Sequence, residues 1–436
     1  MKRNIIKDLV EWKNSQDRMP LIVRGARQVG KTWIMREFGK QEYKNIIYAN
    51  FDDNKKLSNY FEPDLNTKRI IATLSSEFGM PITPQNTLII FDEIQECNRA
   101  LVSLKYFCEN APQYHIIAAG SFLGVATHEG ASFPVGKVDM LTMYPMSFYE
   151  FLSALGEDIL LAAIKKLDFK LIAGLSYKFT NLLKTYLYVG GMPKAVASYA
   201  QYKDIERVRT IQNNILEGYT ADFSKHIKGV TIPKVKMLWD YIPYHLAKEK
   251  KKFIYKDIKQ GGRASEFEDA LNWLINCGLV YKVSKTLSPK IPLASYGERE
   301  AFKLYMLDTG LLCAKSKIDI KTFFETDPKI FDDFQGALME QYVLQELKTI
   351  GSFPVFYWGR ERGTAEVDFI IQFENEIIPI EVKSTINTKS KSLDVYLKEY
   401  APDRAIRISL KNYGLADKLY SIPLYLIESL KDICAS

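Results

Sequence analysis

Gly25-Ala-Arg-Gln-Val-Gly-Lys-Thr32 decides the fold of the first part of this chain, and the apolar run Pro20–Val23 leads into it. The stretch fits G-x-x-x-x-G-K-[ST], the pattern of a strand, a phosphate-wrapping loop and a helix start. Its glycines let backbone N–H groups turn around an anion, and the helix dipole adds positive potential. The alternative is an incidental glycine turn. The pattern predicts a nucleotide site formed by Gly25, Ala26, Arg27, Gln28, Val29, Gly30, Lys31 and Thr32.

An acidic pair follows a second apolar run. The segment Asn86–Phe91 has the composition of a buried strand and ends in Asp92-Glu93. In a P-loop ATPase, Lys31 reaches the β- and γ-phosphates, and the Thr32 hydroxyl and Asp92 hold Mg²⁺. Glu93 is then expected to orient and deprotonate the attacking water. The alternative is a surface acidic pair after a core strand, but in this context the pair predicts ATP hydrolysis.

Two more apolar runs extend the same pattern. Asn45–Phe51 and Tyr114–Ala119 alternate with helical stretches, which predicts an α/β domain with a parallel sheet covered on both faces. Ser121 follows the second run and is a candidate sensor of the γ-phosphate; the alternative is a helix cap.

Composition narrows the class of protein. A chain of 436 residues suggests roughly three domains. Its five cysteines include no C-x-x-C pair, so neither a disulfide framework nor a zinc site is indicated, and the cytoplasm is the expected compartment. No apolar run approaches a membrane span, so we expect no membrane association. The net charge of +7 permits nucleic-acid binding without requiring it.

Helical periodicity dominates after the first domain. Ser147 is a predicted helix N-cap with Glu150 three residues later, and helices continue to about residue 220. They are interrupted at Tyr188-Val-Gly-Gly-Met-Pro193, which predicts a sharp turn. This turn is either a helix connector or a nucleotide or interdomain contact.

A winged-helix order is predicted next. A short strand at Lys251–Tyr255, a turn, an amphipathic helix at Ala264–Gly278 and a hairpin from Leu279 to about Ala294 follow one another. The helix carries Glu266, Glu268 and Asp269, which would repel DNA phosphates. The segment therefore favours packing or partner contact over reading DNA.

The last hundred residues hold a second group of charged side chains. Two predicted strands carry Asp368 and the pair Glu381 and Lys383, which share a face because side chains alternate along a strand. Glu340 lies on the preceding amphipathic helix. A divalent metal held by Asp368, Glu381 and Glu340, with Lys383 polarising water, would cut a phosphodiester. The alternative is a hairpin whose charges pair without metal, and Glu340 could equally pair with Lys348 or another surface base.

Seven motifs together resemble one family. They are Arg24–Thr32, Phe91–Gln95, Ala119–Ser121, Pro145–Phe148, Tyr188–Pro193, Phe302–Leu311, and Glu366-Val-Asp368 with Glu381-Val-Lys383. The chain resembles the prokaryotic AAA-type P-loop ATPases that carry a C-terminal domain of unknown function with a PD-(D/E)xK nuclease-like fold. The resemblance covers nearly the whole chain. One departure is Gly136-Lys137 where the family often has Gly-Arg, because lysine lacks the bidentate contact of an arginine finger.

The resemblance implies a domain order and a function. We expect an AAA-type ATPase domain at 1–150, a helical connector at 151–225, a winged-helix-like domain at 226–312 and a restriction-endonuclease-like α/β domain at 325–436. The expected function is Mg²⁺-dependent ATP hydrolysis coupled to a domain that acts on or binds DNA. The alternative is a regulatory or partner-binding ATPase with an inactive nuclease-like scaffold; a P-loop kinase fits the acidic pair less well. ATP is expected to promote a homo-oligomer, with Arg99 and Lys137 as candidate trans-acting cations.

Overall fold

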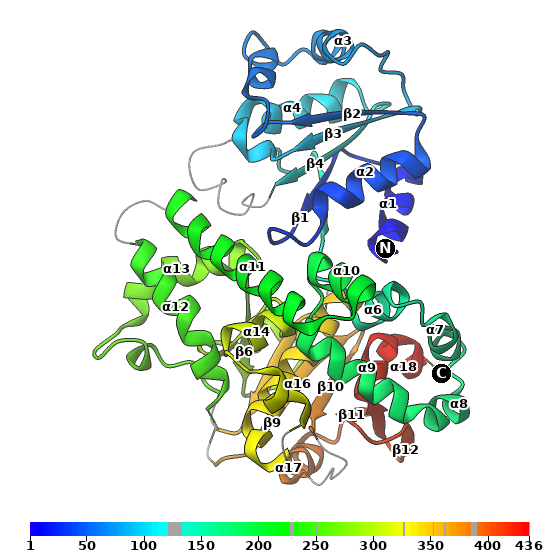
Figure 1. Cartoon of the computed structure of the whole chain (residues 1–436). Coiled ribbons are helices and arrows are strands. Elements are labelled where there is room, and N and C mark those ends of the chain that lie inside the picture. The colour runs from blue at the N-terminus through cyan, green and yellow to red at the C-terminus, as the bar shows by residue number, and fades with distance from the viewer. Residues whose placement is uncertain are drawn as a thin grey trace. The chain divides into compact units, whose positions relative to one another are not determined.

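A computed structural model gives the arrangement of most of the chain (Figure 1). It describes residues 1–120, 133–226, 231–248, 251–325, 328–351, 353–361, 363–384 and 390–435. The chain divides into two compact units. We call Lys2–Tyr144 with Asn276–Leu279 the N-terminal unit, and Pro145–Ile275 with Val280–Ser436 the C-terminal unit.

The N-terminal unit contains the predicted parallel sheet. Its strand order is β2-β3-β4-β1-β5, and every neighbouring pair is parallel. Within the described residues the strands are β1 (Leu21–Arg24), β2 (Asn45–Asn50), β3 (Thr87–Asp92), β4 (His115–Gly120) and β5 (Asp139–Thr142). Because β1 and β3 both run parallel to β4 between them, the loops at their carboxyl ends lie at the same edge of the sheet.

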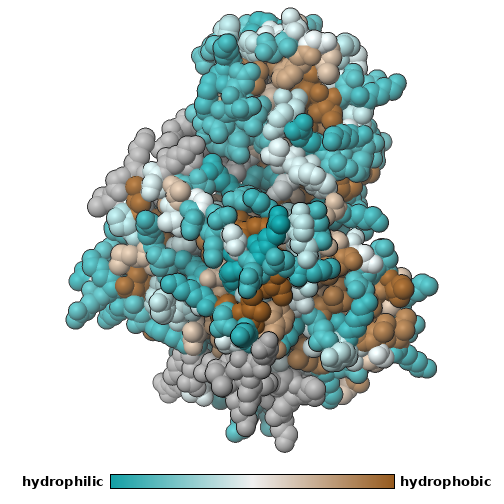
Figure 2. Space-filling model, in the orientation of Figure 1, coloured by the Kyte–Doolittle hydropathy of each residue, from teal (hydrophilic) through white to brown (hydrophobic). Residues whose placement is uncertain are grey.

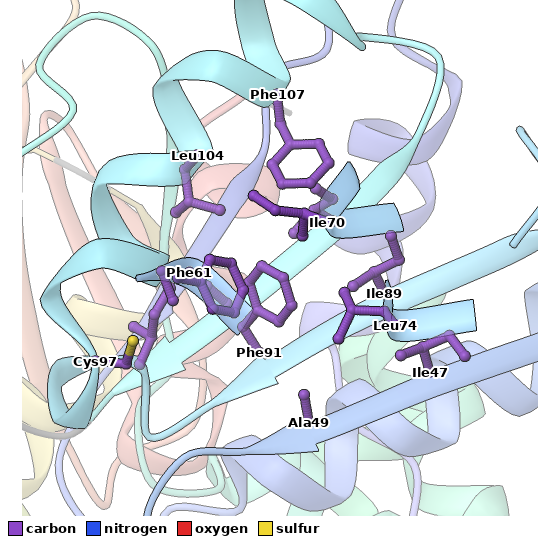
Figure 3. Close-up of a cluster of buried hydrophobic side chains, with 14 of the residues drawn as sticks. Ile47, Ala49, Phe61, Ile70, Leu74, Ile89, Phe91, Cys97, Leu104 and Phe107 are labelled. Carbon is purple, nitrogen blue, oxygen red and sulfur yellow. The ribbon is translucent and has the colours of Figure 1, made fainter. Parts of the chain in front are cut away.

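Helices cover both faces of this sheet. In Figure 1, α1 and α2 lie on the opposite side from α3 and α4. The latter pair buries Ile70, Leu74, Leu104 and Phe107 against the strands, as Figure 3 shows. The elements are α1 (Ile5–Asn14), α2 (Lys31–Glu42), η1 (Lys55–Phe61), α3 (Thr67–Glu77), η2 (Ile94–Glu96) and α4 (Asn98–Asn110). Close packing of buried apolar side chains on each face makes the sheet a rigid support for the glycine-rich loop.

The C-terminal unit is built on a mixed sheet. The strand order is β12-β13-β11-β10-β9-β8-β6-β7. In the part of the unit that is described, the strands are β6 (Val280–Thr286), β7 (Gly297–Met306), β8 (Val355–Gly359), β9 (Glu366–Phe373), β10 (Glu376–Val382), β11 (Ala405–Ser409), β12 (Gly414–Ala416) and β13 (Leu419–Pro423).

Helices precede and interleave with these strands. They are α6 (Phe148–Ala154), α7 (Asp158–Lys165), α8 (Phe169–Gly174), α9 (Ser176–Val189), α10 (Pro193–Tyr202), α11 (Ile205–His226), α12 (Thr231–Leu246), η3 (Tyr255–Asp257), α13 (Ala264–Asn276), η4 (Leu293–Tyr296), α14 (Thr309–Lys315), α15 (Ile320–Glu325), α16 (Pro328–Ile350), α17 (Lys391–Tyr400), η5 (Leu424–Ser429) and α18 (Leu430–Ala435). The predicted cap is confirmed, since Ser147 and Glu150 form a capping box at α6. The turn at Tyr188–Pro193 joins α9 to α10.

The hairpin predicted as a separate wing belongs to the large sheet. Strand β6 pairs with β8 through Lys285–Tyr357 and Thr286–Trp358, so β6 and β7 extend the C-terminal strands. The segments expected as the domains 151–225 and 325–436 therefore lie in one compact unit, together with the segment 226–312 apart from Asn276–Leu279. This pairing depends on residues about seventy positions apart, which local sequence patterns do not reveal.

One predicted strand is wrong. Lys251–Tyr255 forms no strand; its end enters the turn of η3. The Phe253 N–H donates to the Phe302 carbonyl oxygen at 2.8 Å, while the Phe253 ring stacks on that of Phe302. Burial therefore accounts for Phe253 without a strand ladder, whereas Ile254 is exposed.

The face drawn in Figure 2 is mostly hydrophilic, with scattered apolar patches. None of the helices in the described ranges is long and apolar enough to cross a membrane.

Candidate functional site

Two glycines shape the loop between β1 and α2. Gly25 has a φ of 150°, and a Cβ there would lie 2.2 Å from the carbonyl oxygen of Met143. Gly30, just before α2, has a φ of 98°. Both positions require glycine, because a side chain would be strained at either and would strike backbone at Gly25. The predicted phosphate loop thus has the backbone that its pattern requires.

Lys31 is buried inside this loop. Its Nζ donates to the carbonyl oxygens of Gly25 and Ala26, each at 2.8 Å. Burial lowers the pKa of Lys31 to about 8, an effect that the nearby Glu93 and Asp92 oppose. An ammonium held at the centre of a ring of backbone groups is suited to an anionic ligand.

Thr32 and Asp92 meet at the carboxyl ends of β1 and β3. The Thr32 hydroxyl donates to Asp92 Oδ2 at 2.7 Å, and Asp92 is buried. Hydroxyl and carboxylate oxygens are ligands that Mg²⁺ accepts, so these two residues suit the predicted ion.

The structure adds a residue that the sequence analysis missed. The Tyr48 hydroxyl donates to the same Asp92 oxygen at 2.8 Å, and burial raises the pKa of Tyr48 to about 12. Tyr48 lies on β2, whose register places Asn50 opposite Asp92. The only sign of this contact in the sequence was that an apolar run ends in polar residues.

Glu93 stands directly beside this group. Its backbone is left-handed, with a φ of 49°. Gln95 Nε2 donates to Glu93 Oε2 at 2.6 Å, a second contact that the sequence analysis did not anticipate. A non-glycine residue in this conformation is held by its surroundings, as is common at functional sites.

The remaining candidates of the N-terminal unit have mixed outcomes. Ser121 lies outside the described residues. Arg99 Nε donates to the Phe61 carbonyl oxygen at 2.6 Å, and Lys137 pairs with Glu109 at 3.1 Å. Both cations therefore have partners within their own unit.

The second predicted site also assembles. Strands β9 and β10 pair antiparallel, with Phe369 opposite Ile380, so Asp368 and Glu381 are neighbours across the ladder. Lys383 Nζ lies 2.7 Å from Glu381 Oε1, and the Val382 N–H donates to Asp368 Oδ2 at 2.8 Å. Burial, together with Glu340 and Glu381, raises the pKa of Asp368 well above its ordinary value.

Glu340 joins this cluster from α16, but with unforeseen partners. It pairs with Lys251 and accepts a hydrogen bond from the Tyr305 hydroxyl at 3.0 Å. Lys303 Nζ lies 3.7 Å from Glu340 Oε2 and 2.6 Å from Glu366 Oε1. The anticipated partner Lys348 instead faces the ring of Tyr281.

These residues do not suit a divalent metal. Glu381 Oε2 is buried without a hydrogen-bond partner in the described structure, which leaves one candidate ligand. The other carboxylates contact lysine ammonium groups or backbone donors. No group of three or more acidic, histidine or cysteine side chains in the described ranges could hold a metal ion. The predicted metal site at Asp368, Glu381 and Glu340 stays a prediction without support from the geometry.

Three family models match successive parts of the chain. Residues 17–152 match a model described as "AAA domain". Residues 180–322 match "Domain of unknown function (DUF8612)", and residues 335–427 match "Domain of unknown function (DUF4143)". The first match shows an AAA-type P-loop ATPase domain, as the sequence motifs predicted. The winged-helix and nuclease-like assignments stay predictions.

Two individual proteins match a short part of the chain. Uncharacterized protein Rv2008c of Mycobacterium tuberculosis and uncharacterized protein Mb2031c of Mycobacterium bovis are each 31% identical over 104 residues. Each match covers 24% of this chain and 22% of the relative.

Solved structures show only a loose likeness. A Walker-type ATPase of Pyrococcus abyssi aligns over 72% of this chain and 95% of its own, with 15% identity and a TM-score of 0.46. The RuvB Holliday junction branch migration motor of Thermotoga maritima aligns over 64% of this chain and 89% of its own, with 11% identity and a TM-score of 0.29. At these scores the likeness carries no argument about function.

Proposed function

We propose that the N-terminal unit binds ATP with Mg²⁺ and hydrolyses it. Lys31 holds the β- and γ-phosphates, while backbone N–H groups of the loop surround them. Thr32 and Asp92 hold the Mg²⁺, which supplies positive charge to the transferred phosphoryl group. Glu93 orients the attacking water and accepts its proton.

The observation that carries this proposal is the convergence of three side chains from two elements. Thr32 and Lys31 begin α2, and Asp92 ends β3, yet Thr32 Oγ1 and Asp92 Oδ2 are 2.7 Å apart. Glu93 is close enough to Lys31 to oppose the fall in the lysine pKa. Phosphate, metal and water ligands thus share one edge of the sheet, the arrangement that phosphoryl transfer uses.

Substitution of Lys31 and Glu93 tests these roles. Lys31→Ala is expected to abolish or strongly weaken ATP binding, because the phosphates lose their buried cation. Glu93→Gln is expected to keep binding but to lower kcat by at least ~100-fold, the usual loss on removing a general base. Binding is measured with a fluorescent ATP analogue and turnover by phosphate release.

Glu96→Gln is the matched control. Glu96 lies three residues after Glu93 and pairs with the exposed Lys55 at 3.0 Å, so its loss should leave turnover unchanged. Equal turnover of wild type and Glu93→Gln would reject Glu93 as the base.

For the C-terminal unit we propose the scaffold of a regulatory or partner-binding ATPase. The observation that favours this function is that lysines pair with Glu340, Glu366 and Glu381. The rival candidate is Mg²⁺-dependent action on DNA by a nuclease-like fold, supported by the unpaired oxygen of Glu381. The exposed Glu268 and Asp269 on α13 weigh against a DNA-reading wing.

We also propose that the chain self-associates, and this proposal rests on the proposed ATPase function. AAA-type sites commonly borrow a cation from an adjacent subunit. Arg99 and Lys137 are the candidates, and either would have to leave its present partner to act in trans.

A further inference from the structure

A fully buried lysine lies among the C-terminal carboxylates. Lys303 on β7 is 1% exposed. Its Nζ lies 2.6 Å from Glu366 Oε1 on β9 and 3.7 Å from Glu340 Oε2 on α16. A buried ammonium is stable only when opposite charges surround it, because desolvation disfavours a lone charge.

Two further lysines complete the charge balance. Lys251 pairs with Glu340, and its side chain is 12% exposed. Lys383 pairs with Glu381 at 2.7 Å, and the Ser390 hydroxyl donates to the same carboxylate oxygen at 2.6 Å. Glu340, Glu366 and Glu381 thus each have an ammonium partner, whereas Asp368 accepts a hydrogen bond from the Val382 N–H.

The partners come from two parts of the chain. Lys251 and Lys303, with Tyr305, belong to the segment 180–322, whereas Glu340 and Glu366 belong to 335–427. The two segments match different family models, yet their charged groups pair within the C-terminal unit, where Lys303 and Glu340 are buried and the Glu366 side chain is 40% exposed. Neither segment alone could bury its share of these charges without a large desolvation penalty.

We propose that Lys303 is the resident cation between Glu340 and Glu366 and that, together with Lys251 and Lys383, it neutralises this cluster without a divalent ion. The cluster is then a clamp that joins the segment 251–306 to the segment 340–383. Adding a divalent ion would require the displacement of at least one lysine. This inference concerns the C-terminal unit alone and does not depend on ATP hydrolysis.

Titration of the full chain with Mn²⁺ in the absence of nucleotide tests the proposal. We expect calorimetry to show the same Mn²⁺ binding for wild type and for Asp368→Asn. We also expect EDTA to leave the Tm of wild type unchanged. Lys303→Met should lower the Tm by roughly 10 °C, because it leaves buried carboxylates uncompensated. In this variant Mn²⁺ should recover part of the lost Tm.

Lys282→Met is the matched control. Lys282 lies on the neighbouring strand β6, opposite Leu304, and is exposed over the ring of Phe302. Its substitution should lower the Tm by far less and give no response to Mn²⁺. A folded Lys303→Met protein with the Tm of wild type would contradict the clamp.

Three outcomes separate the C-terminal candidates. Mn²⁺ binding by wild type that Asp368→Asn abolishes would overturn the proposal, whether or not Lys303→Met folds. Mn²⁺-dependent cleavage of DNA that Asp368→Ala loses, with ATP hydrolysis retained, would overturn it and favour the nuclease candidate. Loss of ATP hydrolysis alone would leave the clamp standing, since that activity belongs to the other unit.

Discussion

His115 is a buried side chain that should make the N-terminal unit sensitive to acid. It begins β4, and its Nδ1 shares a hydrogen bond of 2.6 Å with the Tyr43 hydroxyl. Burial, reinforced by Arg18 and Lys13, lowers the pKa of His115 to about 4 from an ordinary 6.5. A histidine with a lowered folded pKa favours the folded state fully above pH 6.5. That contribution is lost as the pH falls from 6.5 towards 4.

We therefore expect the free energy of unfolding of wild type to fall relative to that of His115→Phe as the pH decreases. The relative change should approach about 3 kcal/mol by pH 4. Denaturant titrations of both proteins at pH 7.5 and pH 5 follow this change in the free energy of unfolding. The transition to follow is that of the N-terminal unit, which added nucleotide is expected to shift. Parallel pH profiles for the two proteins would contradict the assignment.

The turn that connects α9 to α10 requires the glycine at Gly191. Gly191 N–H donates to Asp308 Oδ2 at 2.6 Å, and a Cβ at Gly191 would lie 2.1 Å from the Met146 carbonyl oxygen. Backbone cannot move aside as a side chain can, so Gly191→Ala should destabilise the C-terminal unit by roughly 3 kcal/mol. Thermal unfolding measures the loss.

Gly174→Ala is the control. Gly174 lies at the end of α8 with open space around it, so its substitution should be neutral or slightly stabilising; an equal loss of stability there would refute the argument.

Two compact units in one chain should unfold in two steps. The ATP site lies wholly within the N-terminal unit, so a non-hydrolysable ATP analogue with Mg²⁺ should raise only one calorimetric transition. At a ligand concentration about 100-fold above Kd the gain is about 2.7 kcal/mol, or a rise of roughly 5–10 °C for a unit of this size. Lys31→Ala should remove the shift. A single transition, or an equal rise of both, would show that the units do not unfold independently.

The sequence was sufficient where the determining signals are local. The loop from Gly25 to Thr32 follows from glycine geometry, and the cap at Ser147 follows from hydrogen bonding to Glu150 three residues later. The acidic pair at Asp92 comes directly at the end of an apolar run that forms a buried strand. Alternating strand and helix patterns also predicted the parallel sheet, because each strand must be buried on both faces. These features predict a nucleotide site at the edge of the sheet where Thr32 and Asp92 meet.

Tertiary structure alone decided which charges meet. Lys303 contacts Glu366 across sixty-three positions, and Lys251 contacts Glu340 across eighty-nine. Nothing in the local pattern of either lysine indicates burial, since lysine is ordinarily exposed. The pairing of β6 with β8 brings the two segments into one sheet. Through that long-range pairing, Glu340, which the sequence predicted as a metal ligand, lies beside Lys251, and ammonium groups and a divalent ion compete for the same oxygens.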